Sequence, residues 1–334
     1  MEMRQLGSSG LMVSELSLGT MIFGEQTDRS TPTDIAEEMI HRYLDAGGNF
    51  IDTANVYGDG RSEEIVGQAL RGRRDDVILA TKVRFRRGKG PNNIGLSRRH
   101  IMTEVENSLR RLQTDVIDLY YAHMWDPITP LDETLRAFDD LVAAGKVRYI
   151  GVSNFKAWQL MKALALSDNY GWARPIAAQY QHSLVVRDIE REFVELFLRE
   201  GVGSVPWGPL GGGFLSGKYR SGESPQEGRL STAEEGHEEA WQRRDSDRNW
   251  RILEVLGEIA ERRQKSYAQI ALNWLLSRPE VSSVIIGART PEQLDDNLGA
   301  VAWELSGEEL DRLDEVSAPD WGYPYRMMRA EGAG

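Results

Sequence analysis

Residues 49–58 read Asn-Phe-Ile-Asp-Thr-Ala-Asn-Val-Tyr-Gly, which takes the chain from an apolar strand into a polar turn. Two later stretches have the same pattern, namely 77–82 (Val-Ile-Leu-Ala-Thr-Lys) and 116–123 (Val-Ile-Asp-Leu-Tyr-Tyr-Ala-His). Their apolar runs end on ionisable side chains, which are Asp52, Lys82 and His123. Because the carboxyl ends of parallel strands meet at one face of an α/β protein, we expect these side chains to gather there, with Tyr57 just above them.

The rest of the chain alternates apolar, strand-like segments with amphipathic, helical ones. Strands are predicted at eight places: 16–19, 50–52, 77–82, 116–121, 149–152, 177–180, 202–206 and 284–287. Helices are predicted at 33–46, 65–70, 97–112, 131–144, 156–166, 189–200, 250–262, 267–276 and 290–300. This alternation predicts an α/β fold, a closed (β/α)8 TIM barrel. A doubly wound sheet is the alternative, but it would carry a glycine-rich fingerprint after its first strand, and residues 18–21 (Leu-Gly-Thr-Met) carry none.

Three segments lie outside this alternation. Residues 3–6 and 12–16 flank Gly-Ser-Ser-Gly and predict an N-terminal β-hairpin within 1–16. A long polar loop, 206–249, follows the seventh strand, and a structureless loop of that length is typical of a functional or disordered segment. We expect one barrel domain over residues 1–334, with a C-terminal tail at 319–334.

Composition excludes several classes of protein. The chain has 40 Lys and Arg against 52 Asp and Glu, a net charge of −12 that argues against nucleic-acid or anionic-membrane binding. It has no cysteine, and neither a signal peptide nor an apolar run long enough to span a membrane is evident, so a cytoplasmic location is expected. A homo-oligomer is compatible with the sequence. A basic cluster is interpreted as a solvated loop; it comprises Arg84, Arg86, Arg87, Lys89, Arg98 and Arg99.

The four residues of the opening stretches suit proton transfer. A tyrosine is a poor acid at neutral pH, but a nearby ammonium such as that of Lys82 would lower the pKa of Tyr57. Asp52 could hold Lys82 in place, and His123 could orient a substrate oxygen. The set suits protonation of an oxyanion that forms as hydride reaches a carbonyl. Metal hydrolysis is not indicated, because the histidines lack ligand spacing, and a serine elbow is absent.

A phosphate site is predicted after the eighth strand. Thr290 is a candidate N-cap, Pro291 a first-turn proline, and Gln293 completes a capping-box pattern. The free N–H groups of the helix start, with the guanidinium of Arg289, would suit the 2′-phosphate of NADP. Alternatively, Arg289 pairs only with a carboxylate. Gln293 and Asn297 would face the same way, toward the adenine or ribose.

The glycine-rich stretch 206–219 offers a second phosphate contact. Its spacing from Gly212 to Lys218 fits a P-loop, but Tyr219 replaces the required Ser or Thr and no helix pattern follows. We expect this backbone instead to fold over a cofactor pyrophosphate, with Leu210, Ser216 and Lys218 touching it.

The chain resembles the aldo-keto reductase superfamily, and its bacterial and potassium-channel-β-like branch most of all. The motifs that carry the resemblance are 50–58 with 62–67, 81–82, 121–123, 151–155, the strand at Gln179, 209–218 and 287–297. The resemblance covers about the whole barrel. It implies reversible, NADPH-dependent reduction of aldehydes or ketones to alcohols.

The resemblance also implies residue roles. Tyr57 would be the general acid, tuned by Lys82 and Asp52, and His123 would orient the carbonyl. The cofactor NADP(H) would be held by Gly19, Thr20, Met21, Asp52, Ser153, Asn154, Gln179, Trp207, Pro209, Leu210, Ser216, Lys218, Gly287, Arg289, Gln293 and Asn297. Of these, Trp207 would stack on the nicotinamide in place of a more usual tyrosine. Outside this set, Asn55 would add a polar contact near the substrate.

The substrate would be a small carbonyl compound. Its pocket is predicted from Phe23, Tyr57, His123 and Trp125, with Lys89 and the tail residues Trp321, Tyr323 and Tyr325 as further candidates. These aromatic residues favour a flat or apolar compound. The tail could equally be a packing segment. Two alternative functions stay open, a cofactor-binding redox sensor or auxiliary subunit with little turnover and a barrel glycosidase, although no second carboxylate pairs with Asp52 for the latter.

Overall fold

The structure is a computed structural model that describes residues 1–24, 30–226, 228–232 and 240–331. Its main sheet has parallel strands in the order β10-β3-β4-β5-β6-β7-β8-β9. The strands are β3 (Leu16–Gly19), β4 (Phe50–Asp52), β5 (Ile78–Val83), β6 (Ile117–Ala122), β7 (Val147–Ser153), β8 (Pro175–Gln179), β9 (Gly203–Ser204) and β10 (Val284–Ile286). Each of the eight predicted strands is therefore present.

The two ends of this order are joined, so the sheet closes. Ser204 of β9 forms a parallel bridge with Val281, just before β10. The amide of Ile285 in β10 donates to the carbonyl of Pro206 at 3.0 Å. The predicted (β/α)8 barrel is confirmed, and the open, doubly wound alternative is wrong.

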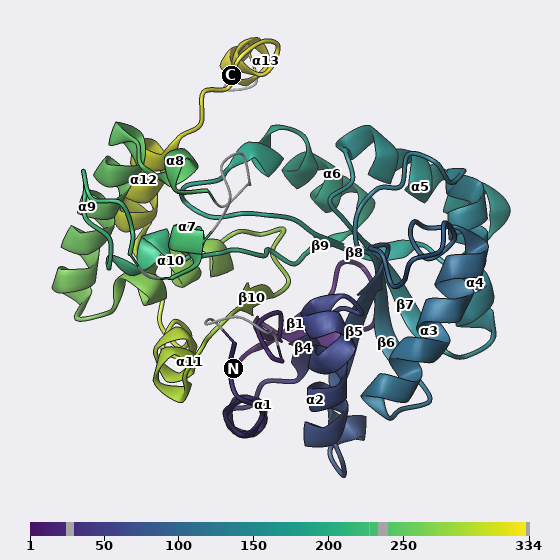
Figure 1. Ribbon diagram of the computed structural model, residues 1–334. Coiled ribbons are helices and arrows are strands. Elements are labelled where there is room, and N and C mark those ends of the chain that lie inside the picture. Colours follow the sequence, from purple (N-terminus) through teal and green to yellow (C-terminus); the bar gives the residue numbers. More distant parts are fainter. Residues whose placement is uncertain (25–29, 227, 233–239, 332–334) are drawn as a thin grey trace.

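Helices surround the strands (Figure 1). They are α1 (Thr33–Asp45), α2 (Arg61–Ala69), α3 (Arg98–Leu112), α4 (Leu131–Ala143), α5 (Ala157–Tyr170), α6 (Phe193–Glu200), α9 (Asp247–Arg263), α10 (Tyr267–Leu276), α11 (Pro291–Leu298) and α12 (Gly307–Ser317). Side-chain caps fix several starts: Ser97 accepts from the amide of His100 before α3, and Ser266 with Gln269 forms a capping box before α10. All but α12 overlap a predicted helix.

The barrel interior is closed at its amino end by the predicted hairpin, which is β1 (Met3–Gln5) paired with β2 (Met12–Ser14). Leu6 and Val13 are fully buried in one cluster with the inward-facing strand residues. Those strand residues are Phe50, Ala80, Leu119, Tyr121, Ala177, Val205 and Ile285. Apolar side chains thus fill the amino end of the barrel, and the polar residues at the strand ends lie at the opposite, carboxyl end.

The long loop after the seventh strand is not structureless, contrary to the prediction. It contains a 3-10 turn (Phe214–Ser216), α7 (Arg229–Thr232) and α8 (Trp241–Arg244). Aromatic contacts explain this order: the ring of Phe214 lies 4.9 Å from that of Trp250, which in turn packs against Trp241. Residues 227 and 233–239 of this loop lie outside the described part of the chain.

The C-terminal tail also forms a helix, α13 (Tyr325–Glu331), which projects away from the body of the protein (Figure 1). The Tyr323 side chain is 84% exposed. The hydroxyl of Tyr325 donates to Glu192 at 2.6 Å, just before α6. The structure therefore directs these two aromatic residues toward solvent and α6 rather than toward the barrel mouth, so their predicted place in the substrate pocket is wrong.

Candidate active site

The structure brings the four predicted catalytic residues together at the carboxyl end of the barrel. Lys82 near the end of β5 is completely buried, and its ammonium donates to three acceptors. These are Asp52 Oδ1 at 2.5 Å, the Thr53 carbonyl at 2.8 Å and the Tyr57 hydroxyl at 3.3 Å. The ring of His123, which follows β6, lies edge-on to that of Tyr57 with centroids 5.8 Å apart. Every proton of the ammonium is thereby used, so its position is fixed.

The backbone after Tyr57 explains why this side chain can reach the ammonium. Gly58 and Asp59 both adopt left-handed conformations, with φ of 54° and 57°. A Cβ at Gly58 would lie 2.8 Å from the carbonyl oxygen of Gly24, so glycine is required there by space as well as by φ. The tight turn projects Tyr57 over the strand ends.

Asn55 does not line the substrate pocket, contrary to expectation. Its side chain is completely buried and donates to Glu104 Oε2 of α3 at 2.8 Å. The neighbouring Asp59 pairs with Arg87, whose guanidinium also lies 3.9 Å from Glu104. These contacts anchor the loop that carries Tyr57 to α3.

Burial governs the protonation of the site. Burial raises the pKa of Tyr57 above its usual value, and the Lys82 ammonium acts in the opposite direction, as predicted, without outweighing burial. Burial tends to lower the pKa of Lys82, but the Asp52 carboxylate outweighs it and the net shift is upward. Burial, with Lys82 and Arg84 close by, lowers the pKa of His123 well below its usual range. At neutral pH the tyrosine is a neutral phenol, the lysine a cation and the histidine a neutral imidazole.

The residues predicted to hold a carboxamide form a second layer on β7 and β8. Gln179 Nε2 donates to Asp52 Oδ2 at 2.7 Å, and the Gln179 carbonyl accepts from Ser153 Oγ at 2.8 Å. Asn154 Nδ2 donates to Ser153 Oγ at 2.9 Å and to the His123 carbonyl at 3.1 Å. The predicted catalytic and cofactor residues therefore share one hydrogen-bond network.

The end of β3 lies beside this network. Gly19 pairs in register with Asp52, and the completely buried Thr20 donates from Oγ1 to the Asp52 carbonyl at 3.1 Å. The Thr20 side chain therefore faces the protein interior. Met21 is half-buried and its sulfur lies 3.8 Å from the Arg229 guanidinium of α7. Across the barrel, Trp207 is half-buried beyond β9, and its Nε1 is buried with no partner among the described residues.

At the predicted phosphate site, Thr290 is the N-cap of α11 as expected, but the side-chain contacts of the residues after it differ from the prediction. Thr290 caps α11 and accepts from the Gln293 amide at 3.4 Å. Gln293 Oε1 accepts from the Arg289 amide at 2.9 Å instead of closing the predicted capping box on Thr290. The Arg289 side chain is exposed. Asn297 is buried and donates to the Gly287 carbonyl at 3.2 Å, whereas Gln293 is exposed, so the expectation that the two side chains face the same way is wrong.

The glycine-rich stretch forms a chain of left-handed turns rather than a P-loop, as expected. Positive φ angles occur at Gly208, Gly211, Gly212, Gly213 and Gly217. Ser216 Oγ donates to the Gly213 carbonyl at 2.8 Å, and Lys218 is exposed. Pro209 is buried and Leu210 half-buried. The amides of Gly211, Gly213 and Leu215 donate to carbonyls within the loop at 2.9–3.0 Å, so its backbone is held by its own hydrogen bonds.

The predicted substrate wall is only partly present. Phe23 is completely buried in the outer core, so its placement in the pocket is wrong. Trp125 is half-buried and packs edge-on against Phe155 with centroids 5.2 Å apart. Phe85 was not among the predicted site residues, yet its ring lies 4.8 Å from that of His123. The strand register could have indicated it, because the residues that follow β5 lie beside His123, which follows β6.

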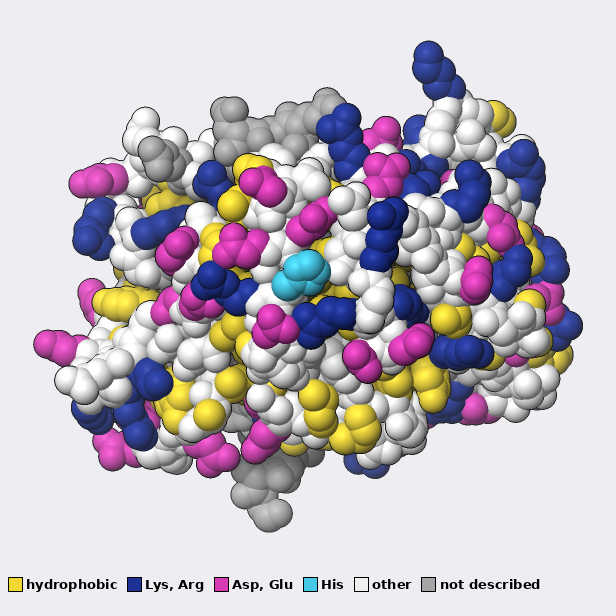
Figure 2. Space-filling model, turned by 90° about the horizontal axis from the view of Figure 1, so that it is seen from below, with side chains coloured by type: hydrophobic (Ala, Val, Ile, Leu, Met, Phe, Trp, Pro, Cys, Tyr) yellow, Lys and Arg dark blue, Asp and Glu magenta, His cyan; other side chains and the backbone are white. Residues whose placement is uncertain are grey.

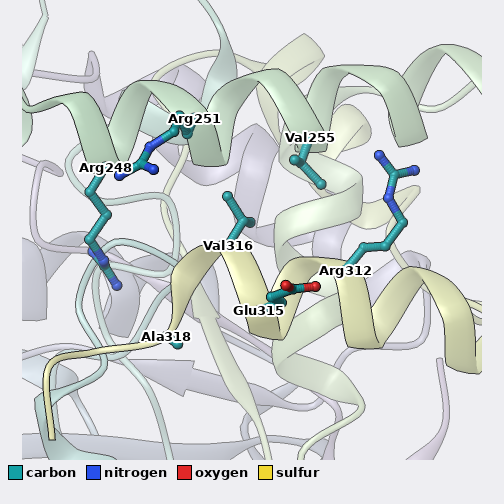
Figure 3. A pocket seen from close by; sticks show the side chains of 7 residues that line it. All are labelled: Arg248, Arg251, Val255, Arg312, Glu315, Val316 and Ala318. Carbon is teal, nitrogen blue, oxygen red and sulfur yellow. The ribbon is translucent and has the colours of Figure 1, made fainter.

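Other features of the described residues lie away from this site. An open pocket of about 500 Å³ lies between α9 and α12, which also contact each other directly; it is lined by Arg248, Arg251, Val255, Arg312, Glu315, Val316 and Ala318 (Figure 3). On the face in Figure 2, basic and acidic side chains are interspersed.

Within the described ranges, no three His, Asp or Glu side chains form a metal-binding group. The helices in those ranges are all too short or too polar to cross a bilayer.

Comparisons with known proteins agree with this architecture. A probable voltage-gated potassium channel subunit beta from Oryza sativa is 39% identical over 95% of this chain and 96% of its own. An uncharacterized oxidoreductase, YrpG, from Bacillus subtilis is 39% identical over 95% of this chain and 96% of its own. Norsolorinic acid reductase stcV from Emericella nidulans is 38% identical over 96% of this chain and 82% of its own. The model of the aldo/keto reductase family matches residues 15–318, and the chain therefore belongs to that family.

Proposed function

We propose that this protein is an NADPH-dependent reductase of aldehydes or ketones, reversible in principle, with Tyr57 as the proton donor. The observation that carries the proposal is the Lys82 ammonium, which is buried between Asp52 Oδ1 at 2.5 Å and the Tyr57 hydroxyl at 3.3 Å. Relatives named as oxidoreductases or reductases support the reaction class. A purely structural ion pair would not need a tyrosine hydroxyl at a barrel mouth, where ligands bind.

The residues around the site fit a nicotinamide dinucleotide. Ser153, Asn154 and Gln179 would hold the carboxamide, and the unpartnered, buried Nε1 of Trp207 is a donor available to the same ligand. The turns of residues 208–217 would hold the pyrophosphate, with Arg289 at the start of α11 for the 2′-phosphate. When bound, the reduced nicotinamide would supply hydride to the carbonyl carbon.

The protein's own side chains would complete the reaction. The neutral imidazole of His123 would donate a hydrogen bond to the carbonyl oxygen and hold it near the Tyr57 hydroxyl. As negative charge grows on that oxygen, Tyr57 would transfer its proton, and the product would be an alcohol. The resulting tyrosinate lies beside the Lys82 ammonium, which Asp52 keeps charged. General acid catalysis of this kind contributes about 10²- to 10⁴-fold to the rate.

A second function is favoured by one specific observation. Two relatives, from Oryza sativa and Arabidopsis thaliana, are named as probable voltage-gated potassium channel subunits beta. By analogy, this protein would bind NADP(H) as a redox sensor or auxiliary subunit and turn over little. Binding of NADPH without measurable reduction of any carbonyl would distinguish this function from the first.

The decisive experiment follows NADPH oxidation with 4-nitrobenzaldehyde, an activated aromatic aldehyde. The Tyr57→Phe variant should lose about 10²-fold or more in kcat, since it keeps the ring and loses the proton. Tyr170→Phe is the matched control, because Tyr170 is 58% exposed and stacks on Trp172 away from the site. Cofactor binding, measured by NADPH fluorescence, should persist in both variants. Full activity of Tyr57→Phe would refute the proposed acid.

A further inference from the structure

Arg84 lies beside the proposed catalytic histidine, although the sequence assigned it to a solvated basic loop. The pairing of β5 with β6 aligns Val83 with Ala122, and the His123 amide donates to the Val83 carbonyl at 3.0 Å. The next residue on each strand end is therefore Arg84 on one side and His123 on the other. Arg84 is also two residues beyond Lys82, and alternate residues of a strand share a face.

Other basic residues of the same loop have partners of their own. Arg87 pairs with Asp59, and Arg98 pairs with Asp140. Arg86 donates to two backbone carbonyls, at 3.2 Å and 3.0 Å. The solvated-loop interpretation is thus wrong for Arg87 and Arg84, which are both half-buried.

Arg84 differs from these neighbours. In the part of the chain that the structure describes, no carboxylate lies within ion-pair distance of its guanidinium, and its Nε is buried without a hydrogen-bond partner. The charge of Arg84 acts on the nearby Asp126 carboxylate without forming an ion pair with it, and that carboxylate accepts from the Leu96 and Ile128 amides and from the Thr129 hydroxyl. A half-buried cation with no anion in contact among the described residues is costly, and a bound anion would offset that cost.

The surroundings of Arg84 are aromatic. Its guanidinium carbon lies 5.4 Å from the centre of the Phe85 ring, and that ring packs edge-on against His123 at 4.8 Å. A ligand held by Arg84 would therefore reach the carbonyl position at His123 along the face or edge of Phe85. This spacing suits a flat molecule with a carbonyl at one end and a negative charge at the other.

We propose that Arg84 forms an anion subsite of the active site, and that the favoured substrates are aromatic carbonyl compounds bearing a carboxylate. The inference rests on the proposed reductase function and narrows its substrate class. Arg84 would hold the carboxylate through its planar fork of N–H donors, and it would take no part in proton transfer.

The test compares 2-, 3- and 4-formylbenzoate with their methyl esters in wild type, Arg84→Met, Arg84→Lys and Arg86→Met. The readout is the ratio of kcat/KM for each acid to that for its ester. For the best-fitting acid, Arg84→Met should lower this ratio by about tenfold or more, since a charge-assisted hydrogen bond contributes about 1.5–3 kcal/mol. Arg84→Lys should restore part of the ratio, and Arg86→Met should leave it at the wild-type value.

A binding measurement supports the kinetics. Benzoate should quench tryptophan fluorescence of the wild type with a dissociation constant about tenfold lower than that of Arg84→Met. If wild type reduces the esters and Arg84→Met leaves the acid-to-ester ratio unchanged, the subsite is refuted while the reductase function stands. If Arg84→Met slows acids and esters equally, Arg84 acts only through His123, and the inference again fails. If wild type reduces 4-nitrobenzaldehyde but neither the acids nor the esters, the proposed substrate class is refuted; if it reduces none of these compounds, the reductase proposal itself fails.

Discussion

Replacing Asp52 with asparagine should destabilise the folded protein by about 3–5 kcal/mol, the usual cost of removing one partner from a buried ion pair. The Lys82 and Asp52 side chains are 0% and 3% exposed, so water cannot replace the lost carboxylate. Asparagine preserves the shape of the side chain but has one acceptor oxygen where the carboxylate uses two, one for Lys82 and one for Gln179 Nε2, so the loss combines the charge with one of these hydrogen bonds. The ammonium would then be left buried with only neutral acceptors.

The substitution should also change the direction in which the stability of the folded protein varies with pH. In wild type the pKa of Lys82 is raised, so its contribution to stability is complete below the unfolded value of about 10.4 and is lost only as pH rises through the folded value. In Asp52→Asn, burial acts without the carboxylate and depresses the pKa of Lys82. Unfolding of the variant then takes up a proton. Its stability should therefore increase with pH up to about 10, where wild type stays level with respect to this group.

The assay is urea denaturation followed by circular dichroism at several pH values between about 7 and 10. The double variant Asp52→Asn with Lys82→Met should be more stable than Asp52→Asn alone, because the unpaired ammonium is gone. Asp45→Asn is a matched control, since Asp45 pairs with Arg73 at the surface and should cost about 1 kcal/mol or less. A loss below about 1 kcal/mol for Asp52→Asn, or strict additivity in the double variant, would refute the reasoning.

Two further predictions concern function. Arg289→Ala should weaken NADPH binding much more than NADH binding, because it removes a cation at the start of α11; equal weakening of both cofactors in fluorescence titrations would contradict a 2′-phosphate contact. The kcat/KM for carbonyl reduction should be level between about pH 6.5 and 8.5, because the pKa of His123 is far below and that of Tyr57 above this range, whereas alcohol oxidation should rise with pH as the tyrosine loses its proton; an inflection of the reduction profile near pH 7 would overturn this assignment.

Much of the fold could be predicted because the barrel repeats one local pattern. Each strand is short and apolar, and each helix carries its own amphipathic face and end signals, as at Ser97 before α3. Of the helices that escaped prediction, α12 opens with a capping box at Ser306 and Glu309, a signal that the sequence does contain, whereas α8 and α13 depend on contacts distant in sequence. α8 is held by the rings of Phe214 and Trp250, and α13 is held at Tyr325 by Glu192. Local periodicity carries no information about such partners.

The candidate active site, like the fold, has a part that could be predicted from local patterns and a part that could not. Local patterns were enough to predict that Asp52, Lys82 and His123 lie at or just beyond strand ends, and hence that they meet at one end of a parallel barrel. Which side chains face that end depends on the packing of the folded chain. In the folded protein Phe23 and Asn55 are buried, Asn297 is turned inward, and Arg84 near His123 has no ion-pair partner among the described residues. These outcomes could not be predicted because local patterns specify the strands, whereas burial and pairing depend on how loops from different strands pack against one another.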